Sequence, residues 1–314
     1  MSFTTNIKDE ISKIEGTKSE SIAELSGFVR NNGVINNNIL TLTTENKVTA
    51  KRISDFLKNL YEVNMKTEIV NNWNYSKKKL YQISLEEKTN FILKDIGYLD
   101  DNDNYLETPP SYIVGANEEI RAYLRGIFFA TGSISDPKKS RYHLELLSYT
   151  PEEAVFVQKL LNIFELNAKI LAREKGYMIY IKEAEKISDF IKLLGANNAV
   201  LYYENVRIYR DQKNKTNRLN NCEQANMDKV FETANEQLRQ IEVIEENDGV
   251  MLLDDKTKET LEYRKKYPEA SLKELAEIIS LETGKTITKS GLNHRMRKIK
   301  DLSTRFEKMK TTNK

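Results

Sequence analysis

Apolar positions along residues 20–85 alternate between two spacings. Steps of three and four residues predict helices, and shorter alternating stretches predict strands. Gly33 is expected to end the first helix, and Thr44 to cap the second. The predicted order is helix, two strands, helix, two strands, with helices at 20–33 and 46–61 and strands within 34–44, at 65–70 and at 79–85.

The same order returns further along the chain. A second apolar helix ends at a glycine, Gly132, and Thr150 with Pro151 gives a typical helix start. The predicted helices are 118–132, 151–164 and 183–196, and the strands are 133–135, 142–149, 168–174 and 177–182. Helix–strand alternation also arises by chance, but two apolar helices that end in glycine at the same place favour a duplicated α+β unit with a pseudo-twofold axis.

The two glycine-ended helices carry one motif. LSGFVRNNG begins at Leu25 and LRGIFFATG at Leu124, and both fit L-x-G-h-h-x-x-x-G, where h is apolar. The pattern resembles the LAGLIDADG motif of homing endonucleases, which implies that the two helices pack side by side. Gly27 and Gly126 suit such packing, because a residue without a β-carbon lets two backbones approach closely.

In the active nucleases of that family, the residue before the last glycine is acidic, and one carboxylate from each helix binds metal. Here these positions hold Asn32 and Thr131, and neither side chain carries negative charge. Divalent metals at phosphoryl-transfer sites need carboxylates. We therefore predict no catalytic residues, no metal and no cofactor, and the helix pair becomes a structural seam. Whether its sheets form a DNA-binding saddle or contact a protein stays open.

The C-terminal third has a different pattern. A long amphipathic helix is predicted over 225–247, closed by Gly249, and shorter helices follow at 257–268, 271–282 and 288–302. Ser271 and Glu274 have the spacing of a capping box. Short helices around the connection 281–287 fit a helix-turn-helix. The residues expected to face inward are Leu272, Leu275, Ala276 and Ile279 on one helix and Leu292, Met296 and Ile299 on the next.

Basic residues gather on the last of these helices. Residues 284–314 include ten Lys or Arg and two acids. A recognition helix contacts base edges with its N-terminal residues, and flanking cations hold phosphates. The candidate DNA-binding residues are Ser271, Lys273, Lys289, Ser290, Asn293, His294, Arg295, Arg297, Lys298 and Lys300. The alternative is a three-helix module with a solvated basic face.

A second basic stretch precedes the long amphipathic helix. Residues 206–219 contain five cations and one acid, Asp211. Two interpretations of this linker stay open: it contacts DNA phosphates, or it is a solvated connector without a ligand. The candidate phosphate contacts are Arg207, Arg210, Lys213, Lys215 and Arg218.

Composition limits the class of protein to which the chain can belong. In 314 residues, 49 basic and 47 acidic side chains nearly balance, so net charge alone identifies no partner. One cysteine, Cys222, allows no internal disulfide, and neither a signal peptide nor a run of about 18 apolar residues is present. A cytoplasmic chain is expected. The predicted domains are 1–205, with repeats at about 20–100 and 118–195, a basic linker at 206–225, and a helical region at 226–314 with a helix-turn-helix at about 255–305.

Several stretches together resemble the WhiA family of bacterial regulators, in order and over essentially the whole chain. They are MSFTTNIKDEI, AELSGFVRNNG, YLRGIFFATGSI, RLNNCEQANMDK, PEASLKELAEII and KSGLNHRMRKI. The resemblance implies an α+β fold: a tandem αββαββα LAGLIDADG-like repeat without nuclease activity, followed by an all-α helix-turn-helix.

The same resemblance implies a sequence-specific transcriptional regulator of the nucleoid, linked to cell division, chromosome segregation or sporulation. Its expected partners are double-stranded DNA and a further regulatory protein, with no membrane and no small-molecule substrate. Two alternatives stay open. One is an active endonuclease, which Asn32 and Thr131 argue against. The other is a protein-interaction scaffold that contacts DNA only incidentally.

Overall fold

The computed structural model describes residues 2–71, 79–139 and 141–312. The chain divides into two compact units, Met1–Asp211 and Gln212–Lys314. The division falls inside the stretch 206–225 that the sequence analysis assigned to a linker. That stretch is helical throughout and belongs to α8 (Asn197–Glu246).

The first unit begins with the helix α1 (Phe3–Ile11) and then folds as two consecutive repeats. The first repeat builds an antiparallel sheet with the strand order β1-β2-β4-β3. Its elements are α2 (Lys18–Arg30), β1 (Val34–Asn36), β2 (Ile39–Thr44), α3 (Lys47–Tyr61), β3 (Lys66–Asn71), β4 (Lys79–Leu85) and α4 (Thr89–Asp95).

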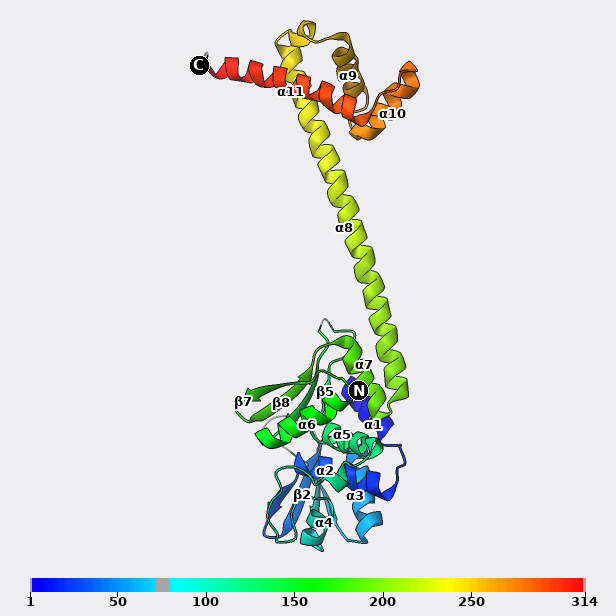
Figure 1. The fold of residues 1–314 in the computed structure, drawn as a ribbon, viewed down its shortest axis with the longest axis vertical. Coiled ribbons are helices and arrows are strands. Elements are labelled where there is room, and N and C mark those ends of the chain that lie inside the picture. Colours follow the sequence, from blue (N-terminus) through cyan, green and yellow to red (C-terminus); the bar gives the residue numbers. More distant parts are fainter. Residues whose placement is uncertain (1, 72–78, 140, 313–314) are drawn as a thin grey trace. The chain divides into compact units, whose positions relative to one another are not determined.

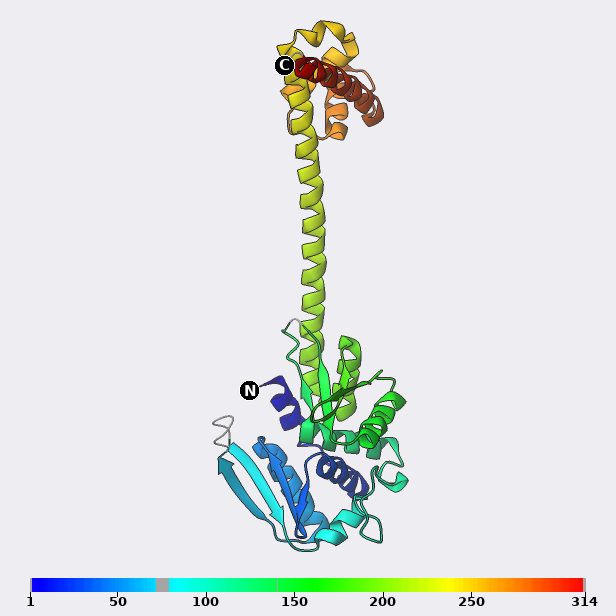
Figure 2. The same cartoon turned by 90° about the vertical axis from the view of Figure 1, so that its left-hand side faces the viewer.

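The second repeat has the same order of elements. Its antiparallel sheet, β5-β6-β8-β7, matches the first strand for strand. Its elements are α5 (Asn117–Thr131), β5 (Ser133–Ile134), β6 (Leu144–Ser148), α6 (Pro151–Ile163), β7 (Lys169–Arg173), β8 (Gly176–Ile181) and α7 (Ala184–Leu194). The predicted duplication is confirmed, and α2 and α5 lie between the two sheets in both views (Figures 1 and 2).

One continuous core holds the first unit together. Apolar side chains from both motif helices, both sheets and α7 belong to it, and α1 adds Phe3, Ile7 and Ile11. The opening helix is thus an integral part of the first unit. Burial of each such large side chain contributes about 1.5–3 kcal/mol.

Helix starts follow local capping chemistry, with one correction to the sequence analysis. Thr150 caps α6 with Pro151 at its first position, as predicted. Thr44 was expected to cap the next helix, but Asn46 does so, accepting hydrogen bonds from the amides of Val48 and Thr49. The prediction was wrong because β2 continues through Thr44, which leaves the cap position two residues later.

Helix α8 is longer than the sequence pattern indicated. Neither glycine nor proline occurs between Asn197 and Glu246, so nothing in the chain breaks the backbone hydrogen bonding. The predicted helix at 225–247 is its C-terminal half. Its middle is exposed on all sides and therefore shows no apolar period.

The second unit packs the end of α8 against three helices. They are α9 (Asp255–Lys266), α10 (Leu272–Thr283) and α11 (Lys289–Thr312), preceded by the short 3-10 helix η2 (Gly249–Leu252). The buried side chains are Ile241 and Ile244 of α8 together with Leu253, Leu261, Leu275, Ala276, Ile279, Leu292, Met296 and Ile299. This confirms the predicted inward face of α10 and α11, except that Leu272 is only half-buried.

Candidate nucleic-acid interface

The seam between the repeats depends on two glycines. A β-carbon at Gly27 would lie 2.3 Å from the carbonyl oxygen of Tyr123, and one at Gly126 would lie 2.0 Å from that of Glu24. No side chain fits at either position. The helices α2 and α5 therefore contact each other backbone to backbone, as the motif predicted.

The two positions that lack an acid have a shared structural role. Asn32 donates from Nδ2 to the carbonyl oxygen of Thr43 and accepts from its amide, both at 2.8 Å. Thr131 donates to the carbonyl oxygen of Leu147 at 2.9 Å and accepts from its amide at 3.1 Å. Thr43 lies on β2 and Leu147 on β6, the corresponding strands of the two repeats. Each side chain joins its motif helix to its sheet.

Neither motif position supplies the kind of ligand that a catalytic metal needs. The side chains of Asn32 and Thr131 each donate one hydrogen bond to a strand backbone and accept one from it. Neither side chain can supply a carboxylate. Nowhere in 2–71, 79–139 or 141–312 do three or more His, Cys, Asp or Glu side chains gather closely enough to hold a metal ion. The missing charge is evident from the sequence, whereas the backbone contacts are evident only from the structure.

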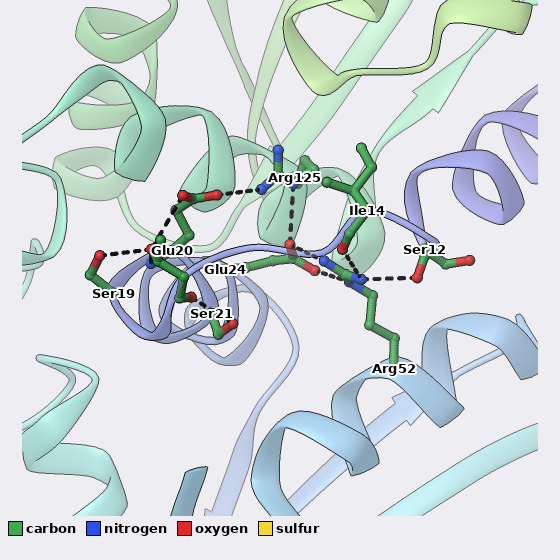
Figure 3. A network of polar contacts seen from close by, with 9 residues as sticks. Ser12, Ile14, Ser19, Glu20, Ser21, Glu24, Arg52 and Arg125 are labelled. Carbon is green, nitrogen blue, oxygen red and sulfur yellow. Dashed lines mark hydrogen bonds and ion pairs between the residues drawn. The ribbon is translucent and has the colours of Figure 1, made fainter. Parts of the chain in front are cut away.

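Charged side chains that the sequence analysis did not single out cross the seam (Figure 3). Glu24 of α2 is 1% exposed. Its carboxylate accepts from Arg52 of α3 at 2.8 Å and from Arg125 of α5 at 3.2 Å. Arg52 also donates to the carbonyl oxygens of Ser12 and Ile14, which follow α1. The network joins both repeats and α1, so its role is structural.

A broad groove of about 1160 Å³ lies beside the end of α5. Lys8 of α1 reaches its floor and donates to the carbonyl oxygen of Phe129 at 3.1 Å, where burial lowers the pKa of the Lys8 ammonium to about 8. The charged lining residues are Lys8, Asp9, Glu45, Lys47, Lys79, Asp136 and Lys139. Because both signs are present in similar number, the groove has no preference for a polyanion.

Some of the cations on the outer faces of the two sheets lie close to acids. On the first sheet, the face opposite the buried Leu40 and Leu42 carries Lys66 and Glu68, which pair at 2.7 Å. On the second, Arg173 lies 3.9 Å from Glu145. These pairs neutralise part of the positive charge, whereas the exposed Lys169 on the outer face of the second sheet forms no salt bridge among the described residues, so the DNA saddle stays a prediction.

The second unit contains the helix-turn-helix. Gly284 ends α10 with a positive φ of 69°, which favours glycine. The hydroxyl of Ser280 accepts from the amide of Ile287 at 2.9 Å and fixes the turn before α11. The capping box of Ser271 and Glu274 is present as predicted.

The first turns of α11 present a polar face to solvent. Leu292, Met296 and Ile299 are buried against the unit, as the three- and four-residue spacing predicted. On the opposite side, six of the candidate DNA-binding residues are exposed: Lys289, Ser290, Asn293, His294, Arg297 and Lys300. Ser271 and Lys273 lie at the start of α10, where the Lys273 ammonium is 3.9 Å from Glu277.

Two of the candidate residues on α11 have partners inside the unit. Arg295 is 17% exposed in its side chain, donates to Thr260 Oγ1 at 3.1 Å and lies 3.6 Å from Glu259. Lys298 pairs with Asp254 at 2.6 Å, and hydrogen bonds from Lys298 and Thr257 hold the pKa of Asp254 well below its usual range. Arg295 thus joins α11 to α9, and Lys298 joins α11 to the residue before α9. Because both cations already have acidic partners, they are weaker candidates for phosphate contact.

The candidate phosphate contacts of the basic stretch all lie on α8. Arg207 pairs with Glu204 at 3.2 Å, and Arg210 donates to the carbonyl oxygens of Pro137 and Lys139, so both are held within the first unit. The remaining three, Lys213, Lys215 and Arg218, are exposed.

Comparison with known proteins covers most of the chain. Three family models match: the WhiA N-terminal LAGLIDADG-like domain over 18–99, the WhiA LAGLIDADG-like domain over 120–213 and the WhiA C-terminal HTH domain over 216–303. A probable cell division protein WhiA of Enterococcus faecalis is 39% identical over 98% of both chains. One of Staphylococcus epidermidis is 40% identical, again over 98% of both.

A solved structure shows the same fold. The crystal structure of full-length DUF199/WhiA from Thermatoga maritima superposes with a TM-score of 0.58 at 23% identity, over 98% of this chain and 99% of that one. The fold and site define a protein with a LAGLIDADG-like repeat that lacks the acid pair, joined to a helix-turn-helix. The chain belongs to the WhiA family.

Proposed function

We propose that this protein is a sequence-specific DNA-binding regulator whose α11 enters the major groove. One observation carries the proposal: the exposed face at the start of α11 combines amide, hydroxyl and cationic side chains and contains no acid before Asp301. Asparagine suits bidentate contact to adenine, and arginine suits guanine. The opposite face is buried, so α11 can present these side chains in only one orientation.

Two side chains of α11 test this proposal. If Asn293 reads a base, Asn293→Ala should cost about 1–3 kcal/mol on the specific site and little on random DNA. If Arg297 holds a phosphate, Arg297→Ala should weaken both complexes alike and lower the slope of log K against log salt by about one. Fluorescence anisotropy with a selected site and a scrambled duplex measures both effects.

Lys298→Ala is the matched control, because Lys298 follows Arg297 directly but pairs with Asp254. We expect it to leave the salt slope nearly unchanged. The proposal is wrong if Asn293→Ala and Arg297→Ala both retain the affinity and selectivity of the parent chain.

We expect no metal-dependent cleavage of DNA. Asn32 and Thr131 supply no carboxylate, and both are bound to strand backbone. A supercoiled plasmid incubated with the protein and Mg²⁺ should stay intact, while a magnesium-dependent nuclease in a parallel reaction confirms that the plasmid is a competent substrate. Reproducible nicking by this chain that disappears in Thr131→Ala would contradict the expectation.

The relatives are named as probable cell division proteins, which supports a role for this chain in controlling that process. Chromosome segregation, sporulation control, a nucleoid location and a further regulatory protein as partner stay predictions from the family resemblance. In the described residues, no helix is both long and apolar enough to cross a membrane. Genome-wide mapping of bound DNA tests the regulatory role: enrichment at promoters of cell-division genes supports it, and uniform occupancy contradicts it.

A further inference from the structure

A small pocket in the second unit brings together cations from four helices. Its volume is about 270 Å³, and it lies where α8, the segment before α10 and the start of α11 meet. Lys229 of α8, Arg264 of α9, Lys273 of α10 and Lys289 of α11 line it. No acidic residue is among the described lining residues.

The ammonium groups around this pocket are poorly neutralised. In the described part of the chain, neither Lys229 nor Lys289 forms a salt bridge, and Lys273 has only the exposed Glu277 at 3.9 Å. Exposed pairs of that kind are weak, because water screens them. Cationic residues that line one concave surface raise its positive potential, and a bound anion lowers the repulsion between them.

Arg264 strengthens this field from inside the unit. It is 1% exposed, and Nη1 donates to the carbonyl oxygen of Ala270 at 2.7 Å, which fixes the segment leading to Ser271. Its Nε has no hydrogen-bond partner. Burial lowers the pKa of Arg264, and no acidic neighbour opposes that effect. The buried Arg264 therefore adds a positive charge to a pocket whose described lining residues include no acid.

The start of α10 adds unused backbone donors. Leu272 and Lys273 occupy its first turn, where amide groups have no acceptor within the helix. The carboxylate of Glu274 accepts from the amide of Ser271 in the capping box, so it satisfies one donor and leaves those two amides without a side-chain partner among the described residues. Helix starts with this arrangement bind phosphate groups.

We propose that this pocket binds a phosphate group of the DNA backbone, with Lys229 of α8 as a phosphate contact outside the helix-turn-helix. The proposal rests on the proposed function, because Lys289 is the first residue of α11 and the backbone beside the major groove passes the start of a recognition helix. The long helix α8 thereby takes a direct part in holding DNA.

Lys229→Gln tests the proposal in the full-length chain. It removes one charge from an exposed side chain and keeps most of its length. Affinity for the selected site and for a scrambled duplex should fall alike, and the slope of log K against log salt should decrease by about 0.9 between 50 and 200 mM KCl. Arg239→Gln on the same helix is the control, because Arg239 pairs with Glu236 at 3.2 Å outside the pocket, and it should leave the slope unchanged.

A second measurement uses inorganic phosphate instead of DNA. At equal ionic strength, phosphate should raise the Tm of the parent chain above its value in chloride, and Lys229→Gln should reduce that difference. A reduced phosphate effect with an unchanged DNA slope assigns the pocket to a free phosphate compound and overturns the DNA assignment. If Lys229→Gln changes neither measurement, the pocket is not a phosphate site.

The two proposals fail in different ways. If the parent chain does not discriminate the selected site from scrambled DNA, the proposed function is wrong, while the Tm measurement still tests the pocket. If the chain discriminates but Lys229→Gln behaves as Arg239→Gln does, only the phosphate contact is wrong.

Discussion

Replacing Gly126 by alanine is expected to destabilise the first unit by about 3 kcal/mol, the upper end of the usual cost of overpacking. The new β-carbon would lie 2.0 Å from the carbonyl oxygen of Glu24 and 2.8 Å from the amide nitrogen of Phe28. Both atoms belong to the backbone of α2, so no side-chain rotation relieves the overlap and the motif helices must move apart. Differential scanning calorimetry of the full chain should show a lower Tm for one transition.

Gly291→Ala provides the control. It lies inside α11, and its β-carbon would meet Thr288 Oγ1 at 3.5 Å, an ordinary contact. Alanine is favoured over glycine within a helix by about 0.5–1 kcal/mol, so this variant should be slightly more stable. A Gly126→Ala protein as stable as the parent would mean that α2 and α5 are not in backbone contact.

Glu24→Ala is expected to reduce the free energy of unfolding of the same unit by about 3–5 kcal/mol, the usual cost of removing one partner of a buried ion pair. The substitution leaves Arg52 and Arg125 without their shared carboxylate, and their side chains are only 9% and 7% exposed. Two like charges would then face each other in a cavity. Urea denaturation followed by circular dichroism measures the loss.

Glu20→Ala is the comparison, because Glu20 approaches Arg125 only at 3.8 Å and is 21% exposed in its side chain. A more solvated and longer ion pair should contribute about 1 kcal/mol or less. If the two variants lose the same free energy of unfolding, the position of Glu24 between two arginines does not add to the stability of the unit.

Periodicity was enough to predict the duplicated repeat, because both copies bury one face of each helix and strand. It also gave the correct phase of α11, where Leu292, Met296 and Ile299 face inward. The glycines of the motif predicted close contact between α2 and α5. In each case the local pattern and the tertiary contact have the same physical cause, which is burial.

Contacts between distant polar residues could not be predicted in this way. The spacing of Arg295 and Lys298 placed them on a basic helix, but their acidic partners Glu259 and Asp254 lie about forty residues earlier. The inward position of Glu24 has one signal in the sequence: it stands four residues before Phe28, on the apolar face of a motif helix. The continuous α8 was missed because a helix exposed on all sides has no apolar period.

The hydrogen bonds of Asn32 and Thr131 limit which substitutions this chain can accept at the two positions. A single-nucleotide change of Asn32 to aspartate would set a carboxylate against the carbonyl oxygen of Thr43, so the new acid would weaken the fold. Because the repeats use different residues for the same purpose, an acid at Thr131 would need its own independent change. Selection for a stable fold alone therefore opposes the appearance of an acid pair at these two positions.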